Sequence, residues 1–586
     1  MQRSVAVLVA IGVVLSPLYA GESNRVRSVK TRAPLLPNEA EIIATTESGQ
    51  KPPPSSHVTP LSPPVGVYTT LNGFFDYQSN GGACQHIRVN PANGNIHVIY
   101  MISEDSLDSG GPTRGTVYAF SSDGGSSWNN FSNVRVPIRR SGYPSLDLLQ
   151  GPNQGLPVIA NHNVVSVLQS TLFVDAPEGT GTFAELIPPL IMPPMTGGEP
   201  IWPHVAGAAD GSIVFHASIN NQLPTGGGGP NYLTRTSDFG ISWSPLWMQF
   251  PPPFNDPGGA YPTIANGTGR VGTFNLAPGD GAYWLESTDN GATWPSMATT
   301  IYPATRVVGS DTLSNWVGGD VIYNGEIALF AMNTSRTDGE GGFFYAGSRI
   351  EFWSQATGFV DAVPWDSTLY LSQMVGQAFH LSMGYPVLGL SGSTIALVYM
   401  AFQPDTGAGG FNYGDVWYVL SNDGGFTWTS PTNITNTPNL DERYPSISRW
   451  NEPGELNITW QEDTQPGAHA FGDNAPISRS SQVFLKMILT DVNGHGEVPN
   501  HFVLRQNYPN PFNPATKISY TIPTGSSVRL SVYNTLGQEV ETLADEYRNA
   551  GTYEVTFSGE SLASGVYFYR LKAGPHTESK KMTLLR

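Results

Sequence analysis

The chain is patterned as short apolar strands separated by turns, and it lacks the spacing of long amphipathic helices. The segments IHVIYM (96–101), SIVFHAS (212–218), TIALVYM (394–400) and ELNITW (455–460) are apolar runs of strand length. Turns with Gly, Pro or Asn bound them. Short apolar runs between turn residues are typical of β-strands. We therefore predict an all-β protein.

An aromatic residue followed by proline recurs at the start of apolar strands. The five copies begin at Tyr143, Trp202, Tyr261, Tyr385 and Tyr444. The first three follow one another at intervals of 59 residues, as do the last two. The gap between Tyr261 and Tyr385 holds two such periods, with a divergent segment near Trp316, and Cys84 lies one period before Tyr143. Seven units are therefore expected.

Each unit repeats the same order of elements. A short strand, a tight turn and a second strand lead through a variable loop to a third strand, and a fourth follows. Four strands at a period of about 60 residues predict a β-propeller. We expect seven blades over residues 67–489, with six as the alternative count. The last unit shows only three strands, so residues 66–78 are expected to supply its fourth and join the two ends of the ring.

A polar frame, Ser/Thr-x-Asp-x-Gly-x-Ser/Thr-Trp, follows the third strand of four units. One catalytic loop seldom needs four copies, whereas a repeat needs one turn per unit. The frames resemble the Asp-boxes, or bacterial neuraminidase repeats, of sialidase-type propellers. The resemblance implies a structural turn in which Asp accepts amide bonds and Trp packs on the blade. The residues in these roles are Asp123, Trp128, Asp238, Trp243, Asp289, Trp294, Asp423 and Trp428.

Antiparallel order places the loops after strand two and the links between units on the face opposite the Asp-boxes. These loops are long, for example 103–115, 220–230, 333–342, 403–415 and 461–481, and variable loops on a rigid scaffold are the usual place of function. The aromatic residues before proline either stack on sugars there or pack the inner strands. The candidate ligand-binding residues are Arg139, Arg140, Trp202, Tyr261, Tyr385, Asp441, Glu442, Arg443 and Tyr444.

Charge and composition limit the kinds of ligand and cofactor that the chain is expected to bind. The net charge of −18 argues against a nucleic-acid surface. Cys84 is the only cysteine, which excludes an intrachain disulfide. The scattered histidines show no metal-ligand spacing, and no phosphate loop is present, so neither a metal nor another cofactor is expected.

The two ends of the chain carry export signals. Arg3, the apolar run 5–15 and the small residue Ala20 are typical of a secretory signal peptide over residues 1–20. That run is short for a membrane span, so no transmembrane span is expected in the mature chain. Residues 21–66, rich in Pro, Ser and Thr, are predicted to be a flexible linker.

The C-terminal segment changes character after a polar linker at 490–500. Apolar and polar residues alternate around Ile518, Val528 and Val555, which predicts a small Ig-like β-sandwich over 501–586. The segments NYPNPFNP (507–514) and VYNTLGQEV (532–540), with Lys581 and Arg586 near the end, resemble the type A sorting domain of the type IX secretion system. The resemblance implies a Gram-negative bacterium of the Bacteroidetes type. It also implies contact with the secretion machinery, domain removal, and release or attachment to a surface lipopolysaccharide.

Three functions remain open at this stage. The leading interpretation is a secreted or surface-attached propeller that binds a glycan or protein ligand on its long-loop face. The second, implied by the Asp-box resemblance, is a sialidase-type glycoside hydrolase, which binds a carboxylate with three arginines. In that family the first strand begins with an Arg-Ile-Pro motif. In this chain only Arg443, in RYPSI, resembles that motif, and the first unit reads ACQHI instead. The third is a structural surface protein, so whether the chain is an enzyme stays open.

Overall fold

The computed structural model divides the chain into two compact units, Met1–Ile488 and Leu489–Arg586. It describes residues 65–79, 84–107, 111–166, 168–190, 200–219, 231–252, 262–277, 279–338, 343–344, 347–365, 381–471, 475–489, 503–504, 507, 510–522, 526–548, 551–574 and 576–585. The predicted signal peptide, nearly all of the predicted linker 21–66, and the linker 490–500 lie outside the described residues.

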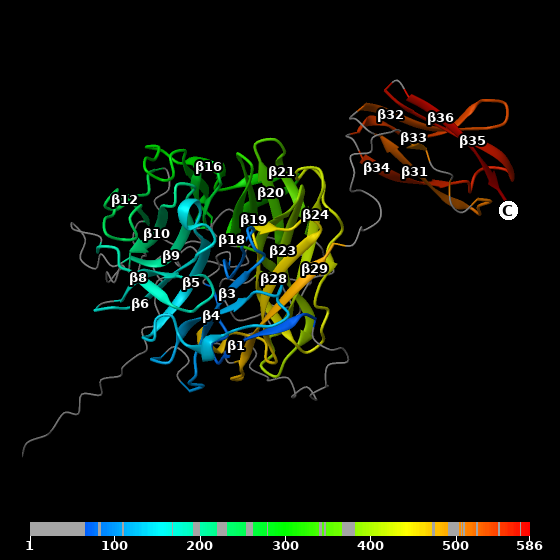
Figure 1. Cartoon of the computed structure of the whole chain (residues 1–586). Helices are drawn as coiled ribbons and strands as arrows, with labels where there is room; N and C mark the ends of the chain where they lie inside the picture. The colour runs from blue at the N-terminus through cyan, green and yellow to red at the C-terminus, as the bar shows by residue number, and fades with distance from the viewer. Residues whose placement is uncertain are drawn as a thin grey trace, which may run out of the picture. The chain divides into compact units, whose positions relative to one another are not determined.

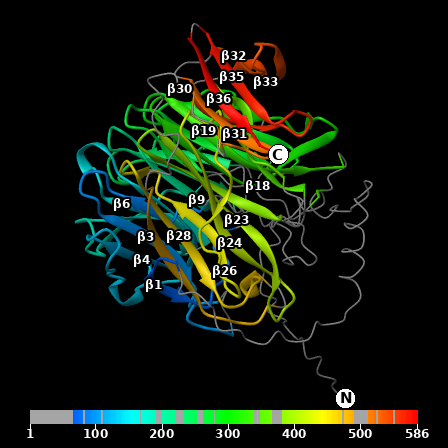
Figure 2. The ribbon, with the colours of Figure 1, turned by 90° about the vertical axis from the view of Figure 1, so that its right-hand side faces the viewer.

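The described residues of the larger unit form seven β-sheets, which we number in chain order. Many of their strands are labelled in Figures 1 and 2. The first three sheets are β2 (Ile87–Val89), β3 (Ile96–Ile102) and β4 (Gly115–Ser121); β5 (Ser141–Leu148), β6 (Pro157–Val164), β7 (Leu168–Asp175) and β8 (Phe183–Leu186); and β9 (Pro200–Gly207), β10 (Ile213–Ile219), β11 (Asn231–Thr236) and β12 (Met248–Gln249). The fourth and fifth are β13 (Thr263–Ala265), β14 (Val271–Ala277), β15 (Gly281–Ser287) and β16 (Thr299–Tyr302); and β17 (Arg306–Val308), β18 (Asp311–Asn324), β19 (Ile327–Arg336), β20 (Arg349–Ser354) and β21 (Gly358–Val363).

Each of the last two sheets of this unit includes a strand that does not follow the others directly in the chain. The sixth holds β22 (Met383–Ser391), β23 (Thr394–Thr406), β24 (Asn412–Ser421), β25 (Thr432–Asn433) and the parallel β27 (Trp450–Asn451), and the seventh holds β26 (Asp441–Ile447), β28 (Glu455–Asp463), β29 (Ser480–Ile488) and β1 (Val67–Gly73). β1 pairs antiparallel with β29, the pairing predicted for residues 66–78. Three short 3-10 turns complete the described elements: η2 (Phe131–Asn133), η3 (Gly151–Asn153) and η6 (His469–Phe471).

Successive sheets pack face to face through apolar cores. Leu146 and Phe173 of the second sheet, for example, pack against Ile99 of the first. One strand of each sheet contacts the corresponding strand of the next, in the order β2, β5, β9, β13, β18, β22 and β26, and β2 also contacts β26 of the seventh. Leu71 and Phe484 of the seventh sheet share a core with β3 and β4. A sheet covered on both faces needs mostly apolar residues on both, as in β3, which is buried at every position; β26 is equally buried although it begins with Asp, Glu and Arg.

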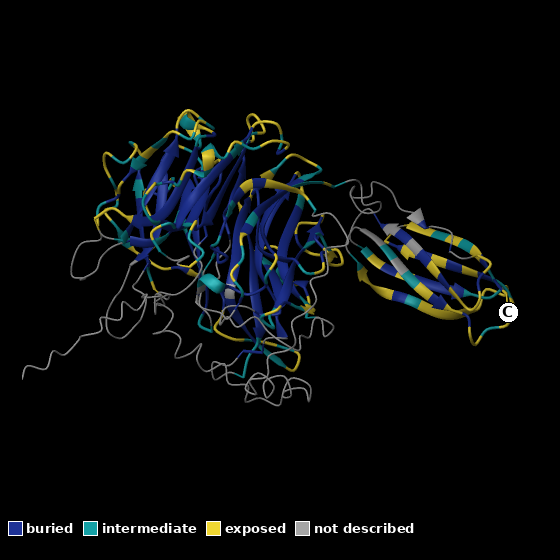
Figure 3. Cartoon of the chain, turned by 90° about the horizontal axis from the view of Figure 1, so that it is seen from below, coloured by how far each residue is buried: buried dark blue, intermediate teal, exposed yellow. Residues whose placement is uncertain are grey.

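The described residues of the smaller unit form two sheets around one core. They consist of β30 (Val503–Leu504), β31 (Ala515–Ile522) and β34 (Gly551–Ser558), and of β32 (Ser526–Tyr533), β33 (Glu539–Arg548), β35 (Gly565–Ala573) and β36 (His576–Leu584). Their residues alternate between buried and exposed, as in β35 (Figure 3). Ile518, Val528 and Phe557 are fully buried, as the alternation predicts. One face of each sheet meets the core and the other meets solvent.

Candidate functional site

The strand order within the sheets gives the larger unit two faces, one at each end of the strands. The turns from strand three to strand four carry the Asp-boxes, and we call this end the Asp-box face. Strand two leads to strand three at the opposite end, where each sheet also leads to the next, and we call that end the long-loop face. The two faces are built from the same sheets, so differences between them arise from side chains and loops.

The aromatic–proline motif forms a β-bulge at the long-loop end of the innermost strands. Tyr143, Trp202, Tyr385 and Tyr444 all have left-handed backbone conformations, with φ between 49° and 56°. The strand register slips at each of the four positions. A bulky residue in this region costs about 1–3 kcal/mol, and such strain gathers at functional sites. The repeat thus stores strain on the long-loop face at every complete motif that the structure describes.

Of the four aromatic residues that the structure describes, only Tyr143 and Trp202 reach the surface. Tyr385 and Tyr444 are 3% and 1% exposed, with their ring centroids 5.2 Å apart. Tyr143 and Trp202 are half-buried, and Tyr261 lies outside the described residues. Packing therefore accounts for Tyr385 and Tyr444, whereas Tyr143 and Trp202 remain candidates for contact with a ligand.

The predicted residue Arg443 lies in an enclosed ionic cluster. Its side chain is completely buried, and its Nε lies 2.7 Å from Asp441 Oδ2. The carboxyls of Asp76 and Asp463 lie close enough to stabilise its charge. Burial raises the pKa of Asp441 to about 7 and that of Asp463 to about 6. One guanidinium among three buried carboxyls has no charge left unmatched for a ligand carboxylate.

Glu442 belongs to a neighbouring pair of carboxyls. It is 1% exposed, and Thr437 donates a hydrogen bond to it. Burial raises its pKa, and the nearby Asp415 raises it further. Burial also raises the pKa of Asp415, although Asn433 donates to that carboxylate at 2.6 Å. Two like charges at one buried site favour sharing of a proton.

The two predicted arginines of the second sheet differ in their partners. The Arg139 guanidinium forms an ion pair with Glu185 and donates to Asn163 at 2.8 Å. Its charge is therefore matched. Arg140 is half-buried and acts electrostatically on Arg114, a residue that the sequence did not single out.

Arg114 is the centre of a cationic cluster at the long-loop end of β4. It is 7% exposed, and its guanidinium lies over the rings of Phe75 and Tyr143 at 5.5 and 5.6 Å. Its Nε donates to the Ser141 carbonyl at 3.1 Å, and its Nη2 lies 3.3 Å from His162 Nε2. Burial and Arg140 lower the pKa of Arg114 to about 10, so it stays charged near neutral pH. It forms no ion pair with any carboxylate that the structure describes.

His162 completes this cluster as a neutral ring. Burial lowers its pKa well below the usual value, and Arg114 and Arg140 lower it further. Because Arg114 can only donate, His162 Nε2 accepts and the proton resides on Nδ1. Nδ1 is buried without a hydrogen-bond partner among the described residues. The sequence offered one signal for this cluster, since Arg114 closes the long loop 103–115.

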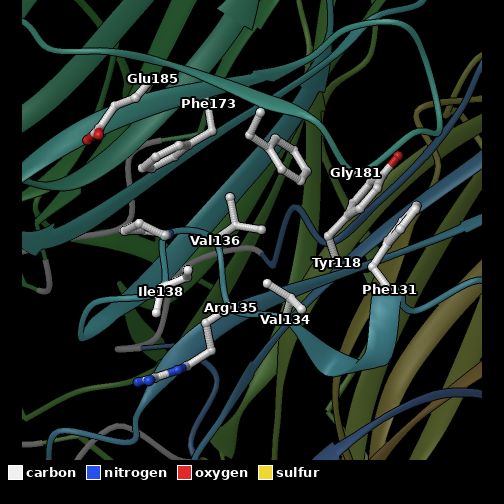
Figure 4. Close-up of a pocket in the computed structure, with 11 residues that line it drawn as sticks. Tyr118, Phe131, Val134, Arg135, Val136, Ile138, Phe173, Gly181 and Glu185 are labelled. Carbon is white, nitrogen blue, oxygen red and sulfur yellow. The ribbon is translucent and has the colours of Figure 1, made fainter.

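An apolar pocket of about 310 Å³ lies between the first and second sheets (Figure 4). The rings of Tyr118 and Phe131 stack in it with their centroids 5.7 Å apart. The charged side chains among its lining residues are Arg135 and Glu185. No predicted ligand-binding residue lines this pocket, although Arg139 binds its Glu185.

Each Asp-box closes on itself by hydrogen bonds. In the first, Asp123 accepts from Ser121 Oγ at 2.8 Å, from the Ser127 amide at 2.9 Å and from the Ser127 hydroxyl at 2.6 Å. These bonds, chiefly from Ser127, lower the pKa of Asp123 to about 2. Asp238, Asp289 and Asp423 repeat the pattern.

In the first and sixth sheets the box glycine and tryptophan contact the preceding sheet. A Cβ on Gly125 would lie 2.0 Å from the Phe484 ring, and one on Gly425 would lie 2.1 Å from Phe352. The neighbouring rings of Trp128 and Trp428 approach the same two phenylalanines, each with centroids 5.2 Å apart. The boxes thus lock adjacent sheets together, and their carboxylates have partners within the turn.

The residues predicted for the sorting signal lie on and beyond the last strand. Lys581 is exposed on β36, opposite Phe568 of β35. Arg586 lies outside the described residues. Among the residues described, no helix is long and apolar enough to cross a membrane. Nor does this part of the chain contain three His, Cys, Asp or Glu side chains arranged to hold a metal ion.

Comparison with known families identifies the smaller unit. Residues 506–584 match the family model described as "Secretion system C-terminal sorting domain". The C-terminal unit is a sorting domain. The match confirms this part of the sequence prediction and supports export to the cell surface or beyond.

Solved structures resemble the fold at low identity. An ulvan lyase described as a polysaccharide lyase of family PL25 shares 11% identity, with 73% of this chain and 96% of that chain covered and a TM-score of 0.45. A Trypanosoma rangeli sialidase shares 12% identity, with 88% of each chain covered and a TM-score of 0.35. No curated protein matches the chain. The described residues of the larger unit are mostly β-strand.

Proposed function

We propose that the larger unit is a closed, seven-bladed β-propeller and that the sorting domain is an Ig-like sandwich. Seven described sheets, joined in sequence by contacts from β2 through β26, support seven blades rather than six. The pairing of β1 with β29 supports closure, because it completes the last blade with the first described strand. In this architecture both faces are open to ligands while the strand edges are protected.

We further propose that the secreted propeller binds a glycan through the first two blades of its long-loop face. Tyr143 is the observation that carries this proposal. It is a half-buried aromatic ring on a strained bulge, flanked by the Arg114 guanidinium. Aromatic faces with adjacent donors suit sugar rings, which present both C–H surfaces and hydroxyls.

The test uses the secreted full chain and a panel of neutral and acidic polysaccharides, with binding measured by affinity electrophoresis. Binding should weaken at least about tenfold in Tyr143→Ala, which corresponds to losing one good ring contact. Phe426→Ala is the matched control, because Phe426 is an aromatic ring, 46% exposed, in an Asp-box. Equal binding by the two variants would refute the proposed face. The absence of any glycan binding would favour a protein ligand or the purely structural alternative.

The sialidase alternative gains no support from the geometry. Its one assigned arginine, Arg443, is enclosed and shared among three carboxyls. Assay of the same preparation for free sugar released from sialosides tests this directly, and release would establish a hydrolase.

For export, we propose a Sec-dependent route followed by type IX secretion to the outer surface. The sorting-domain match supports the second step. Deleting 501–586 should leave a folded propeller in the periplasm, because the two units are separately compact. Fusing 501–586 to an unrelated exported protein should bring that protein to the surface of a host with the type IX apparatus. A truncated propeller found outside the cell would contradict this route. The mass of the exported product tests two further points. Cleavage of the sorting domain lowers this mass, and attachment to lipopolysaccharide raises it.

A further inference from the structure

The larger sheet of the sorting domain separates acidic from basic side chains on the face that points away from the core. Alternate residues of a strand lie on this outward face. Its acidic residues, Glu539 and Asp545, lie on the edge strand β33, where Arg529 of β32 forms an ion pair with each. The other outward positions of β35 and β36 hold neutral residues. The basic residues of these two strands on this face are Arg570, Lys572 and Lys581.

Two aromatic rings lie on the same face beside the basic residues. Tyr533 of β32 is directly opposite Phe568 of β35, and Phe568 is 39% exposed. The Arg570 guanidinium lies 4.9 Å from the centroid of the Tyr533 ring, and its Nε donates to Ser579 Oγ at 3.2 Å. These contacts hold the guanidinium against the sheet. Aromatic residues and arginine are the side chains that protein–protein interfaces favour.

The first segment of the domain fixes the end of β36. The Asn510 side chain accepts a hydrogen bond from the Thr583 amide at 2.9 Å, and the Phe512 amide donates to the Thr583 carbonyl at 2.9 Å. The Phe512 ring is buried in the core of the domain. Residues 506–584, which the family model matches, therefore begin and end at this junction. The junction holds the register of the strand that carries Lys581, so the outward face is preorganised.

We propose that the secretion machinery binds the sorting domain through the recognition face formed by Tyr533, Phe568, Arg570, Lys572 and Lys581, and that its partner there is an acidic protein surface. This deepens the proposed export function and rests on it. A sorting domain acts by being recognised, so one of its surfaces has to contact the machinery. Opposite charges speed such an encounter and orient it, and the exposed ring supplies an apolar contact between them.

The experiment measures export of the full chain in a host with the type IX apparatus, as the ratio of chain outside the cell to chain in the periplasm. Arg570→Glu and Lys581→Glu each reverse one charge of the recognition face. Each should lower this ratio at least about tenfold, the scale of one charge-assisted contact. Lys517→Glu is the matched control, because Lys517 is exposed on β31, in the other sheet of the same domain. It makes the same change of charge and should lower the ratio less than about twofold.

A conservative variant and a stability measurement separate recognition from folding. Arg570→Lys keeps the positive charge and should be exported within about threefold of the wild type, because an acidic partner still meets a cation. Thermal unfolding of the purified full chains should give Arg570→Glu and Lys517→Glu the same midpoint. A midpoint lowered only in Arg570→Glu would explain poor export by misfolding and would overturn the recognition role.

The remaining outcomes separate the recognition face from the export route. Equal export of Arg570→Glu and Lys517→Glu would overturn the face while leaving type IX export intact. Absence of the wild-type chain from outside the cell would count against the route itself, and the proposal would fall with it. Normal export of Arg570→Glu with loss of its attachment to the cell surface would assign the face to anionic groups of lipopolysaccharide and overturn the protein partner.

Discussion

Asp123 and Asp441 are the same side chain at opposite ends of the sheets, and their surroundings move their pKa values in opposite directions. Asp123, in an exposed turn, accepts bonds from Ser121 and Ser127, and its pKa falls to about 2. Asp441 is completely buried beside Arg443, and burial raises its pKa to about 7. The Asp-box face thus satisfies its polar groups within one turn, whereas the long-loop face holds buried charges whose partners also come from segments distant in sequence.

The largest expected effect comes from removing the cation of the long-loop face. Arg443→Met leaves the carboxyls of Asp76, Asp441 and Asp463 buried without their counter-ion. Breaking such a cluster should lower the free energy of unfolding by about 3–5 kcal/mol at pH 8. Urea unfolding followed by tryptophan fluorescence measures this. Arg235→Met, which removes a part-exposed pair with Asp210, should cost less than about 1 kcal/mol. Similar losses in both variants would contradict the contrast.

The next effect tests how the Asp-box face holds its sheets together. Gly424 and Gly425 both have positive φ, 79° and 98°, so alanine strains the backbone at either position. Only at Gly425 does a Cβ strike the Phe352 ring; at Gly424 nothing lies within 4 Å. Gly425→Ala should therefore lose about 1–3 kcal/mol more stability than Gly424→Ala. Equal unfolding midpoints would show that the box does not wedge against the preceding sheet.

Acidity should affect the two faces with opposite sign. The pKa of Asp441 is raised from 3.8 to about 7, so this group favours the folded state at low pH and loses that contribution as pH rises through 4–7. The pKa of Asp123 is lowered to about 2, so its contribution is complete above pH 4 and disappears between 4 and 2. Thermal midpoints should rise from pH 8 to pH 5 and fall below pH 4. For each fully titrating carboxyl of the long-loop face, the free energy of unfolding changes by about 1.4 kcal/mol per pH unit. A midpoint that falls steadily from pH 8 downward would contradict the assignment.

The smallest effect is expected from a single box aspartate. Asp289 accepts from Ser287 Oγ at 2.7 Å and from the Thr293 amide and hydroxyl at 2.8 and 2.6 Å. Asp289→Ala should lower the free energy of unfolding by about 1 kcal/mol, while glycan binding by the folded fraction persists. Thr288→Ala, at the exposed neighbouring position, should change stability by less than about 0.5 kcal/mol. Loss of binding with full stability would give the box a role in recognition.

The periodic features of the fold were accessible from the sequence because they repeat. The interval of 59 residues locates the innermost strands, and the missing strand of the last unit predicts the pairing of β1 with β29. Propensity and turn chemistry could not reveal the left-handed φ of Tyr143, since the residue before proline usually adopts an extended conformation. That conformation follows from the bulge, which exists only once two strands pair.

The candidate site was harder to predict from the sequence, because its residues are far apart in the chain and belong to common residue types. Arg443 stood out by its motif, yet the carboxyls that match its charge include that of Asp76, more than 350 residues away. Arg114 and His162 stood in no motif, and they meet only because the first and second sheets pack together. Pairing of charges is a tertiary property, so a sequence shows which charges exist and not which remain unbalanced.

The junction of β1 with β29 has a consequence for the order of synthesis. Thr69 and Gln482 share a hydrogen bond of 3.0 Å although 413 residues separate them. Contacts of such high contact order form late, and until they do the edge of β29 can pair with other chains. Because the sorting domain follows β29, a chain interrupted before Ile488 lacks the closing strand and the sorting domain together. An interrupted chain therefore lacks the sorting domain, and every chain that carries the sorting domain also contains β29.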